Sequence, residues 1–324
     1  MYSRPSIRQH LRPPQHVHVH GSSGYRYRHL LPYTIIGLCM VLGLYQLALG
    51  RYGSKLSILD EFRAGGDGYR VELVFAATRR SNMSWVGENL PGWRWNIYRV
   101  DDEKAELTVP VNKGNEAMVY LTYLIDRYST LPEMAVFMHD GRYQWHNDNP
   151  LYDSVISIQN LNFTFVKSTG YVNLRCSNIL GCPAELEPAR YLRERPNDFD
   201  HPTAMEFPNS FMELFPGRSV PEKVGTPCCS QFAVSREVIL RRPVEEYIRY
   251  REWLVKTDLP SDITGRIFEY LWHMIFGKPA QSCPDERACY CQTYGLCKLS
   301  EEEVGEQWTW RGLDLPENWP DEMD

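Results

Sequence analysis

The sequence lacks the short motifs by which the commonest hydrolases are recognised. It contains neither G-x-S-x-G nor H-E-x-x-H, so nothing in it indicates a serine hydrolase or a common zinc protease. Residues 69–298 also contain no internal repeat and no low-complexity spacer. That stretch is long enough for one large or two small domains, and its uninterrupted composition favours one.

Acidic residues are absent from the first 51 positions, which hold six arginines and carry +6. Residues 1–29 are rich in Arg, His, Pro, Gly and Ser, a composition that cannot bury a core and predicts a disordered tail. The whole chain carries −6, so the residues after position 51 carry −12. An acidic domain of this kind argues against nucleic acid or anionic lipid as a partner.

Charged residues are also absent from residues 30–49, a run of twenty. A helix of that length is about 30 Å long and spans the hydrocarbon layer of a bilayer. The run is too long and too far from the start for a typical cleaved signal peptide. Because the arginines precede it, the positive-inside rule predicts a type II protein of the endoplasmic reticulum or Golgi, with a cytosolic N-terminus and a lumenal bulk. Residues 50–68 are predicted to form a stem.

Eight of the nine cysteines follow this span, an even number that predicts disulfides in an oxidising compartment. Their pairing stays open, because eight cysteines allow 105 connectivities. The last four are spaced C-x5-C-x-C-x5-C, which favours a disulfide-stapled cap over a zinc site. Sequons at Asn82 and Asn162 predict glycosylation in the same compartment. The cysteines are Cys176, Cys182, Cys228, Cys229, Cys283, Cys289, Cys291 and Cys297.

The remaining pattern predicts an α/β domain over residues 69–298 and an acidic tail over residues 299–324. Strands are expected at 71–77, 93–100, 134–138 and 163–166. Helices are expected at 114–128, at 151–161, from 236, from 243 and at 263–276. Ser235 can cap the third of these helices, and Ser261 or Asp262 can cap the last. Residues 171–182 are expected to form a loop.

The densest set of chemically useful side chains follows the third predicted strand. The apolar run 134–138 predicts a buried strand that stops at His139-Asp140-Gly141. In open α/β sheets, ligands bind just beyond the carboxyl ends of such strands. An aspartate with a neighbouring histidine offers the mixed oxygen and nitrogen ligands that a metal ion can use. The candidate metal ligands are Asp140, His139, His146 and His273.

Further candidates lie in the same stretch and on the last predicted helix. Tyr143 and Trp145 can stack on a sugar or a base, although both residue types are also ordinary core residues. Arg266, Glu269 and His273 form a polar stripe on the helix. A stripe that faces solvent is only an ion-paired surface, whereas one that faces the ligand crevice offers Glu269 as a general base.

Longer motifs of this domain resemble one known family. They are NKGNEAMVYLTYLIDRY (112–128), RYQWHNDNPLYD (142–153), YVNLRC (171–176), CCSQFAVSREVILRRP (228–243) and FEYLWHMIFG (268–277). These segments are similar to the fungal family catalogued as domain of unknown function 3431. The resemblance covers about residues 71–297 and implies the family without implying an activity.

A looser resemblance is to the GT-A glycosyltransferases, which use nucleotide-sugar donors and often Mn²⁺. It implies a Rossmann-like mixed sheet flanked by helices, with the nucleotide bound beside the first strands. The residues at the corresponding places are Arg79, Asp101, Asp102, Asn112 and Lys113. The metal-binding Asp-x-Asp of those enzymes is matched only by His139-Asp140-Gly141, which has one acid rather than two. Dependence on Mn²⁺ or Mg²⁺ therefore stays open, since Arg79, Arg80 or Lys113 could neutralise a leaving diphosphate instead.

An inverting sugar transfer also needs a carboxylate that takes the proton of the acceptor hydroxyl, and Glu269 and Asp148 are the candidates. The resemblance thus implies a type II membrane glycosyltransferase that moves a sugar from a nucleotide-sugar donor to a glycan or glycoconjugate acceptor. A non-catalytic lumenal protein that binds a glycan or a partner on the same scaffold stays open, because a fold does not determine a function. A metal-assisted hydrolase that uses the His/Asp cluster is a third possibility.

Overall fold

The computed structural model of the protein describes residues 68–194 and 201–300. All of them belong to one unit of the chain, Ile58–Asp324. The predicted N-terminal tail and membrane span lie outside the described residues, as do nearly all of the predicted stem and acidic tail. Among the helices that are described, none has the length and apolar character needed to cross a bilayer.

A five-stranded mixed sheet forms the centre of the domain, in the order β2-β1-β3-β5-β4. Strands β1 (Val71–Ala77), β2 (Arg94–Arg99) and β3 (Met134–His139) are parallel to one another. Strand β5 (Phe232–Ser235) runs antiparallel to both of its neighbours, β3 and β4 (Tyr171–Asn173). The predicted α/β class with a mixed sheet is confirmed. The carboxyl ends of the three parallel strands meet at one edge, which is where ligands bind in such sheets.

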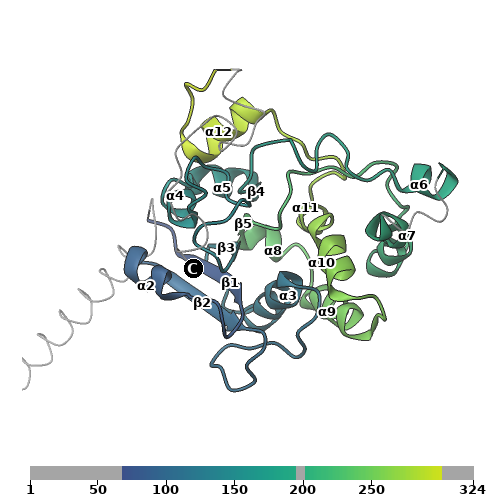
Figure 1. Ribbon diagram of the computed structural model, residues 1–324, viewed down its shortest axis with the longest axis horizontal. Coiled ribbons are helices and arrows are strands. Elements are labelled where there is room, and N and C mark those ends of the chain that lie inside the picture. Colours follow the sequence, from purple (N-terminus) through teal and green to yellow (C-terminus); the bar gives the residue numbers. More distant parts are fainter. Residues whose placement is uncertain (1–67, 195–200, 301–324) are drawn as a thin grey trace, which may run out of the picture. The chain divides into compact units, whose positions relative to one another are not determined.

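Helices surround the sheet (Figure 1). They are α2 (Ser84–Asn89), α3 (Glu116–Asp126), α4 (Ser154–Gln159), α5 (Phe163–Thr169), α6 (Pro188–Glu194), α7 (Pro202–Leu214), α8 (Arg236–Ile239), α9 (Val244–Lys256), α10 (Ser261–Glu269), α11 (Trp272–Ile275) and α12 (Glu286–Tyr294).

Each face of the sheet is covered by its own hydrophobic core. Val74, Phe137 and Phe232 pack with residues of α3, α7, α9, α10 and α11. Leu73 and Val136 point the other way and pack with residues of α2, α4 and α5, because successive side chains of a strand alternate between faces. Figure 1 shows these two groups of helices on opposite sides of the strands. Because both faces of β3 are buried in this way, its sequence is apolar without a break over residues 134–138.

The predicted strand at 163–166 is wrong, since these residues belong to helix α5. Asn162 caps this helix, and its side-chain oxygen accepts a hydrogen bond from the Phe165 N–H at 3.0 Å. Gly170 ends the helix in the left-handed conformation, with φ at 79°. The apolar run is too short for its periodicity to distinguish a strand from a helix.

Two other local predictions also need correction. Residues 171–173 form the edge strand β4 within the segment expected to be a loop. The helix expected at 263–276 is divided into α10 and α11. At the division, the Leu271 N–H bonds to the Phe268 carbonyl, three residues back, at 2.9 Å, a tighter turn than the α-helix uses. Helix α10 begins after Pro260 without a side-chain cap, so the expected cap from Ser261 or Asp262 is absent.

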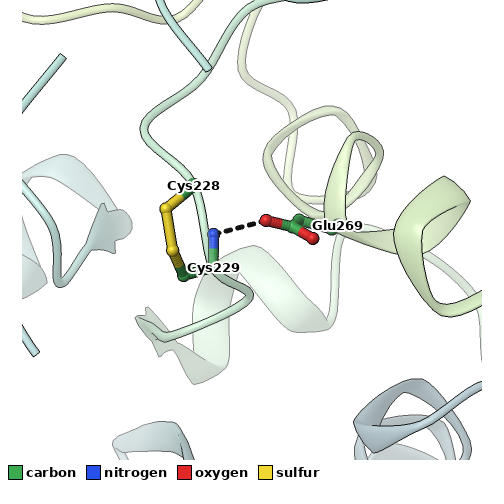
Figure 2. A group of neighbouring side chains, drawn as sticks. All are labelled: Cys228, Cys229 and Glu269. Atoms are coloured by element: carbon green, nitrogen blue, oxygen red, sulfur yellow. Dashed lines mark hydrogen bonds between the residues drawn. A yellow bond between two sulfur atoms is a disulfide. The ribbon is translucent and has the colours of Figure 1, made fainter. Parts of the chain in front are cut away.

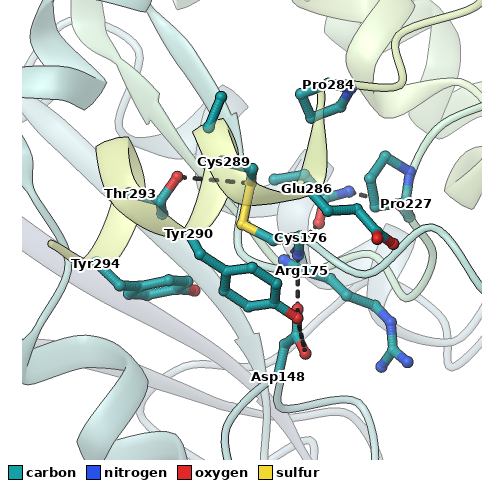
Figure 3. Close-up of a disulfide and its surroundings, with 12 residues drawn as sticks. Asp148, Arg175, Cys176, Pro227, Pro284, Glu286, Cys289, Tyr290, Thr293 and Tyr294 are labelled. Atoms are coloured by element: carbon teal, nitrogen blue, oxygen red, sulfur yellow. Dashed lines mark hydrogen bonds between the residues drawn. A yellow bond between two sulfur atoms is a disulfide. The ribbon is translucent and has the colours of Figure 1, made fainter. Parts of the chain in front are cut away.

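All eight predicted cysteines form disulfides, which confirms that part of the sequence analysis. The pairs are Cys176–Cys289, Cys182–Cys283, Cys228–Cys229 and Cys291–Cys297. The first two pairs connect the segment after β4 to the segment that contains α12. Figure 3 shows the Cys176–Cys289 bond beside this helix.

Candidate active-site cleft

A cleft of about 970 Å³ lies at the carboxyl edge of the parallel strands. One side is formed by the ends of β1 and β3 and by the turn after β3. The other side is formed by α10, by the start of α7 and by the segment that leads into α6. Of the residues proposed from the sequence, the cleft brings together Asn112, His139, Asp140, Trp145, His146 and Glu269.

Asp140 is held in place by the segment that follows β1. The Ser81 hydroxyl donates a hydrogen bond to Oδ2 of Asp140, and the indole N–H of Trp85 donates to the Asp140 carbonyl at 3.0 Å. No hydrogen bond within the described part of the chain engages Oδ1. One carboxylate oxygen is therefore available to a ligand in the cleft.

His139 and His146 form a stacked pair next to Asp140. Their ring centroids lie 4.5 Å apart, with an angle of 18° between the planes. Nε2 of His139 lies 2.9 Å from the Cys229 carbonyl oxygen, and a carbonyl only accepts, so Nε2 carries a proton and donates this bond. Burial lowers the pKa of His146 to about 3, with contributions from His139 and Arg175. His146 is therefore neutral at physiological pH.

Trp145 continues this stack toward solvent. Its ring centroid lies 4.1 Å from that of His146, and 43% of the residue is exposed. The guanidinium carbon of Arg175 lies 5.7 Å from the indole centroid. An indole with an exposed face is suited to stack on a planar base or on the apolar face of a sugar.

Glu269 is the last residue of α10 and lines the same cleft as Asp140. Its Oε1 accepts a hydrogen bond from the Cys229 N–H at 2.6 Å (Figure 2). Burial and the nearby Glu116 raise the pKa of Glu269, whereas the Cys229 N–H opposes this shift. A carboxyl group with a raised pKa is suited to proton transfer near neutral pH. The expected polar stripe is thus split, since Arg266 also lines the cleft and His273 does not.

The cleft is rich in carboxylates. Within the described residues, its lining contains the five acids Glu116, Asp140, Glu185, Asp262 and Glu269 and a single arginine, Arg266. A diphosphate placed here without a counter-ion would be repelled by this charge. The electrostatics therefore favour a divalent cation over protein cations as the partner of any bound phosphate.

The residues proposed to bind the nucleotide lie beside the cleft, with Asn112 in its lining. The Arg79 N–H donates to Asp101 Oδ1 at 2.7 Å, and the Arg79 guanidinium pairs with Asp102 at 3.0 Å. The Lys113 ammonium donates to the Thr257 carbonyl. The bonds from Arg79 to Asp101 and Asp102 hold the turns after β1 and β2 together, and the cations of Arg79 and Lys113 are both engaged with the protein.

Asp148 lies outside the cleft lining and is buried. Its Oδ2 accepts hydrogen bonds from the N–H groups of Cys176 and Ser177, at 2.7 and 3.0 Å. The Tyr290 hydroxyl donates to its Oδ1 at 2.9 Å (Figure 3). The bonds join three segments distant in sequence, so Asp148 supports the fold around the Cys176–Cys289 disulfide.

His273 and Tyr143 also lie away from the cleft lining. His273 is fully buried, with Nε2 at 3.0 Å from the Ala280 carbonyl, and burial lowers its pKa to about 4. The Tyr143 ring lies 4.7 Å from the Arg142 guanidinium. Of the two sequons, Asn82 is exposed, whereas the Asn162 side chain caps α5 and donates to the Gln292 carbonyl at 3.0 Å.

Several cleft residues were not identified from the sequence. Cys229 touches both Glu269 and His139, and the adjacent cysteines were recognised only as disulfide candidates. Ser81, which bonds to Asp140 without lining the cleft, follows β1 and could have been found by the rule that placed Asp140 at a strand end. Glu185 and Tyr191, on the far side of the cleft, have no local pattern that indicates a site.

The potential metal ligands are arranged differently from the sequence expectation. In the described part of the chain, one set of three is close enough to share an ion, namely Cys228, Cys229 and Glu269, with ligand atoms within 4.8 Å of one another. Both sulfurs are bonded to each other in the disulfide. Asp140 with its stacked histidines does not form such a set. A single carboxylate suits Mg²⁺ or Mn²⁺, which proteins commonly hold through one or two carboxylates and the phosphates of a substrate.

Comparison with known proteins adds the family. No curated protein and no solved structure matches the chain. The family described as "Protein of unknown function (DUF3431)" matches residues 73–292. The match begins in β1 and ends in α12, and it contains every residue that lines the cleft. More than half of the sequence is covered, and the chain therefore belongs to the DUF3431 family.

Proposed function

We propose that this protein is a glycosyltransferase that moves a sugar from a nucleotide-sugar donor to a glycan or glycoconjugate acceptor. The observation that carries the proposal is the position of Asp140 and Glu269 in one cleft at the carboxyl edge of the parallel strands. Nucleotides bind at this edge in open α/β sheets. The cleft volume of about 970 Å³ is of the size that a nucleotide sugar and part of an acceptor require.

The donor diphosphate lies near Asp140 in this proposal. Asp140 would hold Mg²⁺ or Mn²⁺ through its available oxygen, and the ion would neutralise the charge that develops on the leaving diphosphate. Five acids in the lining make such a cation necessary. Trp145 offers its exposed face to the base or the sugar, and Asn112 offers an amide to the nucleotide.

Glu269 is the proposed general base. In an inverting transfer, the acceptor oxygen forms a bond to the anomeric carbon, and the bond from that carbon to the diphosphate oxygen breaks. The leaving diphosphate keeps the bonding electron pair, and the proton of the acceptor hydroxyl passes to the Glu269 carboxylate. The raised pKa of Glu269 suits this transfer, since a base is most effective when its pKa lies near the working pH.

The proposal includes the location of the protein. The uncharged run at 30–49 and the arginines before it favour a type II anchor, with a stem over 50–68 and the domain in the lumen of the Golgi or endoplasmic reticulum. Four disulfides fit that compartment, because disulfides persist where the redox environment is oxidising. The GT-A-like relationship of the sheet is part of the same proposal.

A binding protein without catalytic activity is the second candidate. One acid at the end of β3 favours it, as does the engagement of Arg79 and Lys113 with other parts of the protein. Such a protein would use the same cleft to hold a glycan or a partner and would need no general base. The two candidates differ in their response to nucleotides.

Thermal unfolding of the full chain in detergent tests the proposal. Uridine, guanosine, adenosine and cytidine diphosphates would each be added with and without Mn²⁺ to the wild type and to Asp140→Asn. A ligand at 100 times its Kd stabilises the folded state by about 2.7 kcal/mol. We expect one nucleotide to raise the melting temperature of the wild type, only with Mn²⁺, and to leave Asp140→Asn unchanged.

The matched control is Glu252→Gln, which removes an exposed ion pair with Lys256 outside the cleft. It should respond to the nucleotide as the wild type does. A wild type that responds to none of the nucleotides would contradict the transferase proposal and favour the binding protein, for which a glycan array is the next measurement.

A further inference from the structure

The Cys228–Cys229 disulfide joins adjacent residues in the wall of the cleft. Figure 2 shows it beside Glu269. Both backbone polar groups of Cys229, its N–H and its carbonyl, make hydrogen bonds. Its N–H donates to Glu269 at 2.6 Å, and its carbonyl accepts from Nε2 of His139 at 2.9 Å. One residue therefore links the proposed base to the histidine next to Asp140.

The backbone around this disulfide adopts a conformation that ordinary residues avoid. Cys229 has φ at 92° and Ser230 has φ at 50°. Residues other than glycine are strained in this region and persist there only where the surroundings impose the conformation. A disulfide between neighbours closes a small covalent ring, which restrains the intervening peptide. When the ring opens, Cys229 is free to return to negative φ.

We propose that the Cys228–Cys229 disulfide is a site of reversible redox modification, at which a dithiol opens the ring and releases the backbone N–H and carbonyl of Cys229 from Glu269 and His139. Its effect on sugar transfer rests on the proposed function, whereas the release itself does not. Cys228 and Cys229 are 7% and 5% exposed, and Cys229 lines the cleft, so a small dithiol must reach the disulfide from the cleft. By contrast, Cys176 is fully buried.

The exchange balances as an ordinary thiol–disulfide reaction. A thiolate of the dithiol attacks one of the two sulfurs, and a mixed disulfide forms. The second thiol of the reductant then displaces the protein sulfur. The reductant leaves as its own disulfide, while Cys228 and Cys229 together gain two electrons and two protons.

The release changes the two groups that Cys229 holds. Glu269 loses a donor to its Oε1. His139 loses the acceptor that fixes its proton on Nε2, so its neutral ring exchanges between the two tautomers. We expect transfer to fall at least about tenfold in the reduced protein, which is the usual loss for a hydrogen bond to a charged group.

The test is the tautomer of His139, followed by NMR of the full chain with ¹⁵N-labelled histidine, its signal assigned with His139→Gln. The oxidised wild type should show the Nε2–H tautomer. Dithiothreitol should shift the signal toward a mixture, and reoxidation should restore it. Mass spectrometry after alkylation shows which cysteines are reduced, and Cys228 and Cys229 must be among them.

Two matched variants distinguish the effect of losing the disulfide ring from the effect of losing the positive φ that the ring imposes on residue 229. Both lack the disulfide: Cys228→Ala/Cys229→Ala and Cys228→Ala/Cys229→Gly. Glycine adopts positive φ freely, so the glycine variant should keep the Nε2–H tautomer in the presence of dithiothreitol, whereas the alanine variant should show the mixture without it. Cys291→Ala/Cys297→Ala, which lacks an exposed local disulfide, should behave as the wild type.

A His139 signal that dithiothreitol leaves unchanged, with Cys228 and Cys229 alkylated, would overturn the inference. An alanine variant with the wild-type signal would do the same. The measurement uses no nucleotide, so its outcome is independent of the transferase proposal. A redox-dependent tautomer in a protein that binds no nucleotide would support the modification site and leave the proposed function contradicted.

Discussion

At the scale of single residues, the proposed chemistry depends most on Glu269. Its carboxyl group lies at the end of α10, and burial together with Glu116 raises its pKa. A raised pKa means that the folded protein holds this proton to a higher pH than an exposed glutamate does. Because only the carboxylate can accept a proton, the rate of transfer should increase as the pH rises through this pKa.

We expect Glu269→Gln to lower the rate of transfer by about 10²- to 10⁴-fold. In the wild type, the acidic limb of the pH–rate profile should lie above the ordinary glutamate value of about 4.3. Steady-state rates between pH 4 and pH 9 measure both effects once the donor is known. Glu252→Gln should keep the wild-type profile, since its side chain pairs with Lys256 outside the cleft. Equal profiles for Glu269→Gln and the wild type would remove Glu269 from the mechanism.

Two glycines with positive φ provide a second test at this scale. Gly181 has φ at 95°, and a Cβ there would lie 1.9 Å from the Thr226 carbonyl oxygen. Gly217 has φ at 80°, and a Cβ added there would meet no atom within 4 Å. We expect Gly217→Ala to destabilise the protein by about 1 kcal/mol through its backbone conformation alone. Gly181→Ala should cost about 3 kcal/mol or more, because backbone atoms must also move. Urea unfolding compares the two, and equal losses would contradict the close approach at Gly181.

At the scale of elements, sequence patterns succeed where burial is uniform. Strand β1 coincides with its predicted limits, and β3 extends the prediction by one residue, because both carry long apolar runs. Helix α5 was mistaken for a strand, since its limits are set by Asn162 and Gly170 rather than by periodicity. Strand β4 was missed because its pairing with β5 joins residues about 60 positions apart, and no local pattern encodes such a pairing.

The same distinction applies to the cleft. Asp140 and His139 were placed correctly at a strand end, since the rule for parallel sheets is local and general. Asp148 belongs to the same stretch of sequence, yet it is turned toward Cys176 and Ser177. Cys229 reaches the cleft only because β5 is inserted beside β3. Sequence reasoning therefore finds groups at strand ends and misses those that long-range packing brings to them.

The disulfides allow a prediction about the elements that they join. Cys176 and Cys289 are separated by 113 positions, whereas Cys291 and Cys297 are separated by 6. In the loop-entropy treatment, the long closure contributes about 5 kcal/mol and the short one about 2 kcal/mol. We expect Cys176→Ala/Cys289→Ala to lose far more stability than Cys291→Ala/Cys297→Ala. Denaturant unfolding of both variants measures the difference, and equal losses would show that α12 is held by other contacts, such as the Tyr290–Asp148 hydrogen bond.

At the scale of the whole molecule, charge divides the chain into a basic and an acidic part. The first 51 positions carry +6 and the rest −12. The family match, residues 73–292, lies entirely in the acidic part and contains all five strands except the first two residues of β1. The proposed anchor, residues 30–49, and the basic segment before it therefore lie outside the family match.

The topology can be tested in microsomes that contain the full chain. We expect protease to remove the N-terminal segment and to leave a large fragment protected, because the arginines keep the N-terminus in the cytosol. We also expect a glycan on Asn82, which is exposed, so Asn82→Gln should abolish a mobility shift that an endoglycosidase removes. Asn162→Gln should leave that shift in place, since the Asn162 side chain is bonded to Phe165 and Gln292.

Deletion of residues 30–49 is the matched control for the anchor. The shortened chain should leave the membrane fraction in alkaline carbonate, while the wild type stays in it, because the deleted run is the apolar segment proposed to cross the bilayer. A full chain that is digested throughout and carries no glycan would place the domain in the cytosol. In that case four disulfides would need another explanation, since cytosolic thiols are kept reduced, and the redox site at Cys228–Cys229 would be expected in its open state.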